Sequence, residues 1–447
     1  MATARRSWLE RLALHRPELR AWAMYDWANS AMITIIVTAV FPIFFAQVAW
    51  REVPGWTAAE VHGLATTASL LLVAVIAPVL GAVSDRSRSK KKLLAVFALL
   101  GAAACAGMFF VHPGQWEFAA ALFLVANLGA SASFVFYDAL LPHVAREGEV
   151  DQLSTSSFAL GYLGGGLLLA FDLAVIQKPE WFGLPSGDGM TPHEASLPAR
   201  IAFLSVAVWW LAFSLPLLLR VPEPEGTGDG GAPLPFVAAL RAAFGGLGKT
   251  LRELLRYRNA ALMLLAFLIY NDGITTTFRM ATVYGKELEL DSGQMILAIL
   301  LVQFVGVPCT FLFGWVASRV GTKRAILGGL ATYGVVTLLA YGLESARDFF
   351  LMATLIGFVQ GGTQALSRSL FSSLIPPEKS GEFFGFFAVF DRFAGIFGPL
   401  LFALAVTLTG EVRNAVLPLL GFFLIGALVL LRVDVEGGRR AVRKRAR

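Results

Sequence analysis

The chain has 447 residues, of which 56% are hydrophobic and only 15% are charged. Soluble domains carry charge on roughly a quarter of their residues, so this composition excludes an ordinary soluble enzyme or binding domain and indicates an integral membrane protein. The net charge of +6 does not predict nucleic-acid binding, because the basic residues lie in short segments between apolar runs.

Cysteine and histidine usage gives no sign of a metal or cofactor site. Cys105 and Cys309 lie inside apolar runs and are expected to be buried thiols. The five histidines are scattered without ligand spacing and fall at expected helix ends or in loops. We therefore expect no metal, no cofactor and no enzymatic activity.

The predicted helices begin after a basic N-terminal arm, which precedes an apolar run too long for the core of a signal peptide. We expect this first helix to be uncleaved. About 20 apolar residues are enough to cross a bilayer as a helix. Twelve runs of that length occur, at residues 22–48, 58–83, 93–112, 116–141, 155–176, 199–219, 259–284, 294–317, 325–343, 348–374, 382–408 and 414–431.

A linker separates the first six runs from the last six. It opens with a Pro, Gly and acidic stretch that cannot bury a core. Its remainder spaces apolar and basic residues as in a helix that lies on the membrane surface. The predicted organisation is therefore an arm (1–21), a six-helix bundle (22–220), a linker (221–258), a second bundle (259–432) and a basic tail (433–447).

The distribution of Lys and Arg predicts the orientation. Most of them fall in the arm, in the loops after even-numbered helices and in the tail. Basic residues favour the cytoplasmic side, so we expect both termini in the cytoplasm of a prokaryote, with the protein in its inner membrane. The basic loops are expected to contact anionic lipid.

An internal repeat relates the two halves. Gly81–Arg86 reads GAVSDR and Gly314–Arg319 reads GWVASR, and each precedes basic residues. Leu141-Pro142 and Ile375-Pro376 match in nearly the same frame. The pattern predicts an all-α membrane protein of twelve transmembrane helices in two pseudo-symmetric six-helix bundles, which is the major facilitator architecture.

Specific motifs carry a family resemblance. Gly81, Asp85 and Arg86 fit the major facilitator signature after the second helix, although Arg88 stands where that signature has a second Gly. The chain also resembles the autophagy-related vacuole effluxer family through Tyr25–Ser30, Phe136–Pro142, Gly161–Gly166, Tyr270–Gly273, Gln360–Ser369 and Glu382–Phe387. The resemblance implies a twelve-helix facilitator, amino-acid export in eukaryotic members, and a gating latch formed by Gly81, Asp85, Arg86, Gly314 and Arg319.

Polar residues inside the predicted helices define the candidate substrate site. Such residues are costly in lipid, so they should face a protein interior or a water-filled cavity. Their three- and four-residue spacing on the first, seventh and tenth helices places them on shared faces. The predicted substrate-binding residues are Asp26, Asn29, Thr34, Asn271, Asp272, Thr276, Arg279, Gln360 and Gln364.

The charges in this set have two interpretations. Asp272 and Arg279 could clamp the two charged groups of a zwitterion, or they could form a structural ion pair. The same alternatives hold for Asp391-Arg392 on the eleventh helix. A buried carboxylate can also carry a proton, and the candidates for proton coupling are Asp26, Asp138, Asp272 and Asp391.

The sequence therefore predicts a monomeric secondary transporter that works by alternating access. We expect a small polar or zwitterionic substrate, with amino acids favoured by the resemblance, and efflux driven by a proton gradient. Two alternatives stay open: an exporter of drugs or sugars with the same fold, and a membrane scaffold or receptor that transports nothing.

Overall fold

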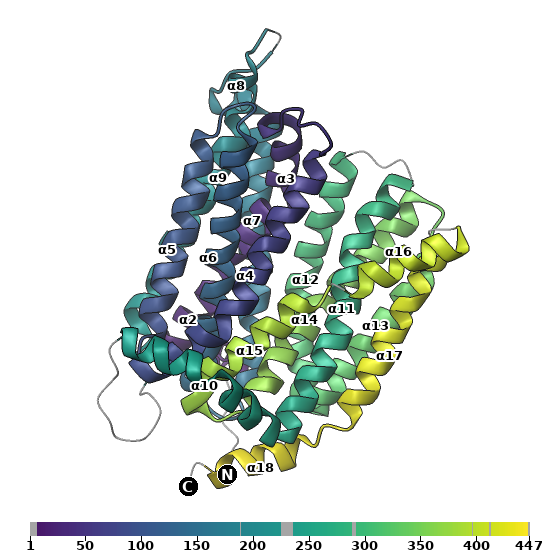
Figure 1. Ribbon diagram of the computed structural model, residues 1–447. Helices are drawn as coiled ribbons and strands as arrows, with labels where there is room; N and C mark the ends of the chain where they lie inside the picture. Colours follow the sequence, from purple (N-terminus) through teal and green to yellow (C-terminus); the bar gives the residue numbers. More distant parts are fainter. Residues whose placement is uncertain are drawn as a thin grey trace.

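The computed structural model describes residues 7–187, 189–224, 236–287, 292–395, 397–410 and 413–445. In these ranges the regular structure is helical, apart from an isolated bridge between Val53 and Trp56. Twelve helices are long and apolar enough to cross a membrane. This count confirms the predicted all-α, twelve-helix fold (Figure 1).

The first half of the chain supplies six of these spans. The first span, Pro17–Ala49, is composite. It contains α2 (Pro17–Ala31), a π-helix (Met32–Ala39), α3 (Phe41–Phe44) and a second π-helix (Phe45–Ala49). The others are α4 (Ala58–Ser87), α5 (Lys90–Gly107), α6 (Trp116–Val144), α7 (Val150–Gln177) and α9 (Leu197–Arg220), the last preceded by the short α8 (Pro192–Ala195).

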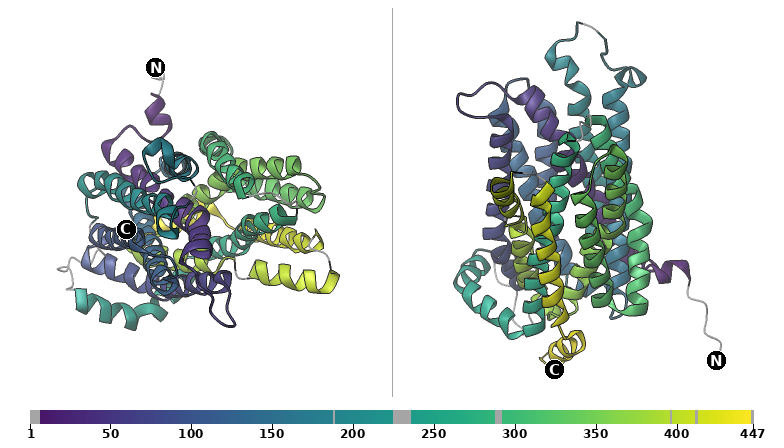
Figure 2. Two further views of the ribbon diagram at one scale, coloured as in Figure 1. Left: turned by 90° about the horizontal axis from the view of Figure 1, so that it is seen from above. Right: turned by 90° about the vertical axis from the view of Figure 1, so that its right-hand side faces the viewer.

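The second half supplies the other six. They are α11 (Arg258–Glu287), α12 (Ser292–Val320), α13 (Thr322–Tyr341), α14 (Ala346–Ser372), the pair α15 (Ser380–Phe393) and α16 (Phe397–Thr409), and α17 (Leu417–Leu431). Three further helices lie outside the spans, namely α1 (Trp8–Arg11), α10 (Phe236–Arg256) and α18 (Val435–Arg445). Helices α10 and α18 lie at one end of the bundle and α8 at the other (Figures 1 and 2).

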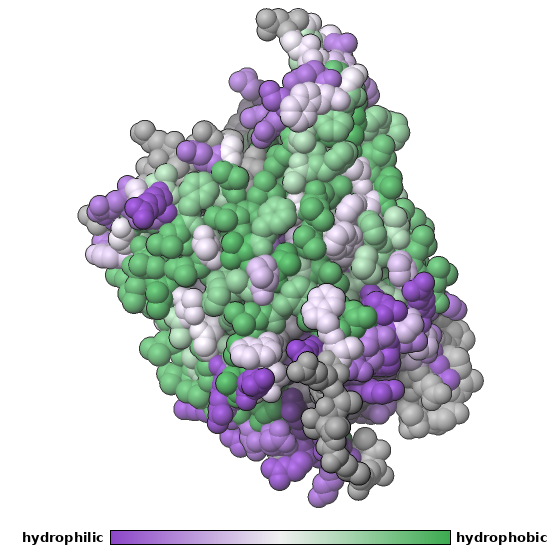
Figure 3. Space-filling view, turned by 180° about the vertical axis from the view of Figure 1, so that it is seen from behind, coloured by the Kyte–Doolittle hydropathy of each residue, from purple (hydrophilic) through white to green (hydrophobic). Residues whose placement is uncertain are grey.

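The outer surface agrees with membrane embedding. Large apolar side chains such as Val75, Leu219 and Leu424 are more than 60% exposed. In the space-filling view an apolar belt surrounds the bundle, with hydrophilic residues gathered at both ends (Figure 3). Apolar contacts with lipid replace the contacts with water that such residues avoid in soluble proteins.

Two spans depart from the continuous helices that the sequence predicted. In the first span the N–H of Val40 donates to the carbonyl of Ile35 at 2.8 Å, a bond to the fifth residue back. Pro42 has no N–H, so the carbonyl of Thr38 lacks its α-helical donor. In the eleventh span, α15 and α16 are separated at Gly395, whose φ of +94° lies in the left-handed region.

Glycines on α7 allow it to pack closely on the first span. A Cβ at Gly161 would lie 2.5 Å from the Ser30 hydroxyl, and one at Gly164 would lie 2.8 Å from the carbonyl of Trp27. Side chains at these positions would push the two helices apart. The close approach brings the polar face of α2 next to that of α7, where the central site is built.

Candidate functional site

A central cavity of about 420 Å³ lies between the two halves. Its walls come from the first span, α6 and α7 of the first half and from α11, α12, α14 and α15 of the second. The polar and charged lining residues are Asp26, Ser30, Thr34, Thr38, Ser131, Asp138, Tyr162, Thr275, Gln303, Gln360, Gln364, Arg368, Asp391 and Arg392. The cavity is the size of a small metabolite with a few waters.

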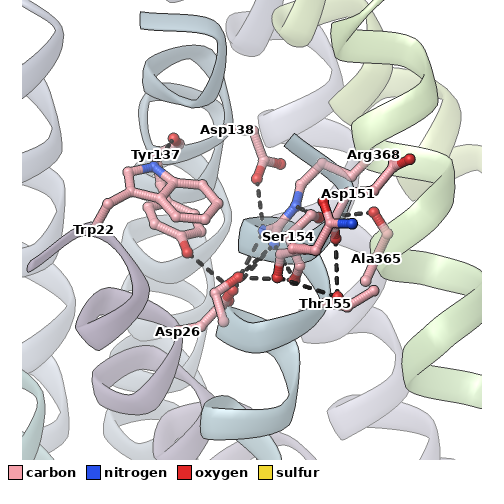
Figure 4. Close-up of polar contacts among 11 residues, drawn as sticks. Trp22, Asp26, Tyr137, Asp138, Asp151, Ser154, Thr155, Ala365 and Arg368 are labelled. Carbon is pink, nitrogen blue, oxygen red and sulfur yellow. Dashed lines mark hydrogen bonds and ion pairs between the residues drawn. The ribbon is translucent and has the colours of Figure 1, made fainter. Parts of the chain in front are cut away.

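Arg368 of α14 is the centre of the polar network around this cavity (Figure 4). Its guanidinium lies 3.2 Å from the Asp26 carboxylate on α2 and 3.1 Å from Asp138 on α6. It also donates to the hydroxyls of Ser154 and Ser157 on α7, at 3.0 and 2.8 Å. One side chain of the second half therefore bonds three helices of the first.

Aromatic rings enclose the guanidinium. Its central carbon lies 5.0 Å from the ring centre of Trp22, 5.4 Å from Tyr137 and 4.5 Å from Phe158. The Tyr137 hydroxyl donates to Asp26 at 2.9 Å. Cation–π contacts strengthen when they are removed from water, and Arg368 is only 3% exposed. The cluster thus holds a positive charge in a dry, fixed position.

The charges of this cluster do not balance. Two carboxylates, Asp26 and Asp138, share the single cation Arg368, so the group carries one net negative charge when both are ionised. The Asp138 side chain is 14% exposed and the Asp26 side chain 5%. Asp138 is therefore the carboxylate that is better placed to exchange a proton with water in the cavity.

A second pair of charges lines the same cavity from α15. Asp391 lies 3.7 Å from the guanidinium of Arg392 and accepts a hydrogen bond from Asn271 at 3.0 Å. The two charged groups are only about one-fifth to one-third exposed. The cavity wall thus presents cationic and anionic groups at two separate places.

Neutral amides complete the lining. Gln303 of α12 donates to the hydroxyl of Thr34 at 2.7 Å, a bond that joins the two halves. Gln360 and Gln364 lie one turn apart on α14, on the side that also carries Arg368. The side-chain oxygens of Gln303 and Gln360 are buried without a donor among the described residues, which leaves them available to a polar substrate.

The residues predicted on the seventh helix are divided by the structure. Asp272 of α11 accepts from the backbone N–H groups of Phe397 and Gly398, at 3.1 and 2.7 Å, and from the hydroxyl of Thr276 at 3.4 Å. Neither Asp272 nor Thr276 lines the central cavity. The side chain of Arg279 lies outside the described part of the structure, so its predicted pairing is not addressed.

The other predicted residues lie at or beside the cavity. Asp26, Thr34, Asp138, Gln360, Gln364 and Asp391 line it. Asn29 is fully buried behind the wall and donates to the hydroxyls of Tyr25 and Ser133. No group of three His, Cys, Asp or Glu side chains that could hold a metal occurs in the part of the chain described.

The first predicted latch lies at the contact between α4 and α15. Asp85 accepts from the backbone N–H groups of Gly381 and Glu382, at 3.1 and 2.8 Å, and lies 2.5 Å from the Lys90 ammonium. The Arg86 guanidinium lies 3.2 Å from the Glu382 carboxylate. These bonds join the two halves near the end that carries α10 and α18.

The repeat-related contact, between α7 and α12, is built differently. Gly314 faces Thr155 of α7, and Arg319 lies over the ring of Trp315 at 5.1 Å. The bonds across this contact come from Asp151, which accepts from the hydroxyls of Thr322 and Ser369 at 2.6 and 2.5 Å. The sequence pattern identified the glycine at this contact but not its carboxylate.

A side chain at Gly81 is expected to open the α4–α15 contact. A Cβ there would overlap the carbonyl oxygen of Gly381. Overpacking typically costs 1–3 kcal/mol, enough to shift a two-state equilibrium roughly tenfold. In Gly81→Ala, a cysteine replacing Ser84 should react correspondingly faster with a membrane-impermeant maleimide. Gly63→Ala, on the same helix and facing open space, is the control and should change nothing.

Comparisons with known proteins agree with this geometry. Residues 60–443 match the model of the family described as vacuole effluxer Atg22 like. An uncharacterized MFS-type transporter of Bacillus subtilis, YxiO, is 33% identical over 419 residues, which cover 93% of this chain and 94% of that protein. Autophagy-related protein 22 of Coccidioides immitis is 23% identical, with 85% of this chain and 73% of that protein covered.

Solved transporters share the fold. A crystal structure of the MFS transporter FucP in the outward conformation superimposes with a TM-score of 0.69 at 14% identity, covering 94% of this chain and all of that one. The proton:xylose symporter XylE gives a TM-score of 0.66 at 14% identity, with 95% of each chain covered. At this identity the likeness shows the fold alone.

Proposed function

The chain belongs to the Atg22-like vacuole effluxer family and is a major facilitator transporter rather than an enzyme, and from this premise we propose that it moves a small zwitterionic metabolite. Amino acids are the first candidates, because the family resemblance implies amino-acid export. We further propose that substrate leaves the cytoplasm by alternating access of the central cavity, with a monomer as the working unit.

The charge arrangement of the cavity is the observation that supports a zwitterion. Arg392 and Asp138 line the same 420 Å³ space from opposite halves. A substrate carboxylate can pair with Arg392, whose Nε has no hydrogen-bond partner in the described residues, while its ammonium pairs with Asp138. Each group then replaces lost hydration with a charged partner inside the membrane.

Proton coupling is proposed on the unbalanced cluster around Arg368. Protonation of one of its two carboxylates would leave a neutral ion pair, so the proton changes the charge that the substrate meets. Of the predicted carriers we favour Asp138, because it combines contact with Arg368, a place in the cavity wall and the greater exposure. Asp26 is the second candidate.

The orientation is proposed from the distribution of charge. The basic residues of the linker helix α10 and of α18 lie at one end of the bundle (Figure 1). Basic segments favour the cytoplasmic side, so we place this end, with both termini, in the cytoplasm of a prokaryotic cell. Its Lys and Arg side chains would contact anionic lipid of the inner leaflet.

Thermal stability of the purified protein against a panel of amino acids tests this proposal. A ligand that binds the native state raises its stability by about 2.7 kcal/mol at 100 times its Kd. We expect one class of amino acid to raise the melting temperature of the wild type and not of Arg392→Gln. Arg347→Gln, an exposed substitution on α14, should respond like the wild type.

Transport in liposomes then separates the proposed function from its alternatives. The stabilising amino acid should exchange across the membrane in wild-type vesicles and much more slowly with Arg392→Gln. A melting shift by sugars instead would favour the second candidate, a neutral polyol substrate, for which the amides of Gln303, Gln360 and Gln364 are suited. Stability and flux that ignore every solute would favour a scaffold that transports nothing.

A further inference from the structure

A second cavity, of about 540 Å³, lies between α1, α7 and α12. It shares no lining residue with the central cavity. We propose that it binds the head group of an anionic phospholipid at the contact between the two halves. Its lining residues are Trp8, Arg11, Leu12, Gln152, Thr155, Ser156, Phe311, Gly314, Trp315, Ser318 and Arg319.

The charge of this lining matches a phosphate. Arg11 and Arg319 are its charged members, and none of the described residues that line it is acidic. The nearest carboxylates in sequence are occupied: Glu10 accepts from the backbone N–H of Ser7 at 2.7 Å, and Asp151 accepts from two hydroxyls of the second half. Two guanidinium groups therefore face the groove without a fixed counter-ion in its wall.

The aromatic residues of the lining indicate the membrane surface. Trp8 is 71% exposed and Trp315 is 55% exposed. Tryptophan is enriched where a membrane meets water, because its ring is apolar and its N–H is polar. Trp315 lies one turn before the end of the spanning helix α12. An acyl chain below a bound head group would cover these rings, which a free phosphate ion would leave exposed.

The first helix is fixed in place beside this groove, so the site is formed before a lipid arrives. Ser156 of α7 donates to the carbonyl of Leu12 at 2.8 Å, and Arg16 lies 2.7 Å from Glu149. Partial burial opposes ionisation, but the N–H of Arg146 and the guanidinium of Arg16 hold the pKa of Glu149 below its usual value. This anchor is therefore ionised at neutral pH, and α1 extends from the flank of the bundle (Figure 2).

One lining group selects among anionic head groups. The side-chain oxygen of Gln152 is buried and has no donor among the described residues. An unpaired buried acceptor is costly, and a ligand hydroxyl removes that cost. A glycerol head group supplies such a hydroxyl beside its phosphate, so the geometry favours phosphatidylglycerol.

Bound lipid would influence the transport cycle. Arg11 and Gln152 belong to the first half of the chain and Arg319 to the second, so a head group that bonds to all three stabilises the arrangement in which α7 and α12 are packed together. This consequence rests on the alternating-access proposal. The binding itself does not, and it can be measured on a protein that transports nothing.

Native mass spectrometry of the full-length protein in detergent tests the site. The probes are dioleoyl phosphatidylglycerol, dioleoyl phosphatidylcholine and inorganic phosphate. We expect the wild type to retain one phosphatidylglycerol in preference to phosphatidylcholine. The double variant Arg11→Gln/Arg319→Gln should bind it about tenfold more weakly or less, since each basic residue near a membrane surface contributes about 1 kcal/mol.

The controls assign each result. Arg324→Gln removes an exposed charge on α13 outside the groove and should retain the lipid; equal loss there would overturn the proposal in favour of general surface charge. Competition by inorganic phosphate at matched concentration would overturn the lipid assignment, as would equal retention of phosphatidylcholine. If the double variant does not give a monodisperse protein, Arg319→Gln alone provides the same comparison.

Discussion

Replacing Arg368 by Gln is expected to abolish transport and to destabilise the protein. The substitution leaves Asp26 and Asp138 buried without the cation that both contact. Breaking a buried ion pair by removing one partner costs about 3–5 kcal/mol. The same loss in the transport cycle would slow flux roughly 100-fold or more. Flux of a radiolabelled substrate into proteoliposomes and the melting temperature measure the two effects.

Two controls distinguish the network from the charge alone. Arg368→Lys keeps a cation but loses the planar fork that reaches both carboxylates and the face of Phe158. We expect it to recover stability in part and transport hardly at all. Arg347→Gln, an exposed arginine on the same helix, should match the wild type. Normal flux in Arg368→Gln would remove this network from the mechanism.

Replacing Asp138 by Asn is expected to separate transport from the proton gradient. The amide has nearly the shape of a protonated carboxyl and cannot release a proton. The remaining pair, Asp26 with Arg368, stays intact. We therefore expect exchange of substrate down its own gradient to continue, while a pH gradient no longer drives accumulation. Measuring both in the same proteoliposomes provides an internal control for folding.

The matched variant Asp26→Asn decides between the two candidate carriers. Asp26 also accepts from the Tyr137 hydroxyl, so this change disturbs the packing around Arg368 as well as the charge. We expect it to lower both exchange and accumulation. If Asp26→Asn alone abolished the response to pH and Asp138→Asn kept it, Asp26 would be the carrier and our assignment would be wrong.

The sequence predicted the architecture well because the membrane imposes it. Hydrophobic runs of spanning length and a repeated Gly81–Arg86 pattern were enough for twelve helices and the family. Much of the cavity wall was also foreseen, since Asp26, Asp138 and Gln360 are polar residues in apolar helices. In lipid, such residues have few places to lie other than a shared interior.

Arg368 was missed although the sequence carried a signal for it. Gln360, Gln364 and Arg368 follow one another at four-residue spacing, which places them on one helix face. Its position close to the end of an apolar run suggested a residue at the membrane surface. The structure continues α14 to Ser372, so Arg368 lies inside the protein, where only the folded partners Asp26 and Asp138 make its burial favourable.

The position of Asp272 depends on a helix break that periodicity does not reveal. The left-handed Gly395 interrupts the eleventh span, and the new helix α16 begins with backbone N–H groups that need acceptors. Asp272 supplies one from another helix, at 2.7 Å from the N–H of Gly398. Its role toward substrate stays a prediction, as does that of Arg279.

The contacts that hold the halves together at the α10/α18 end have a consequence for how that end opens. Asp85 and Asp151 accept mainly from backbone N–H groups and hydroxyls of the opposite half. Water can replace such neutral donors nearly one for one. Separation of these surfaces is therefore a wetting event, governed by the activity of water rather than by the breaking of strong bonds. Osmolytes that are excluded from protein surfaces should hold this end closed.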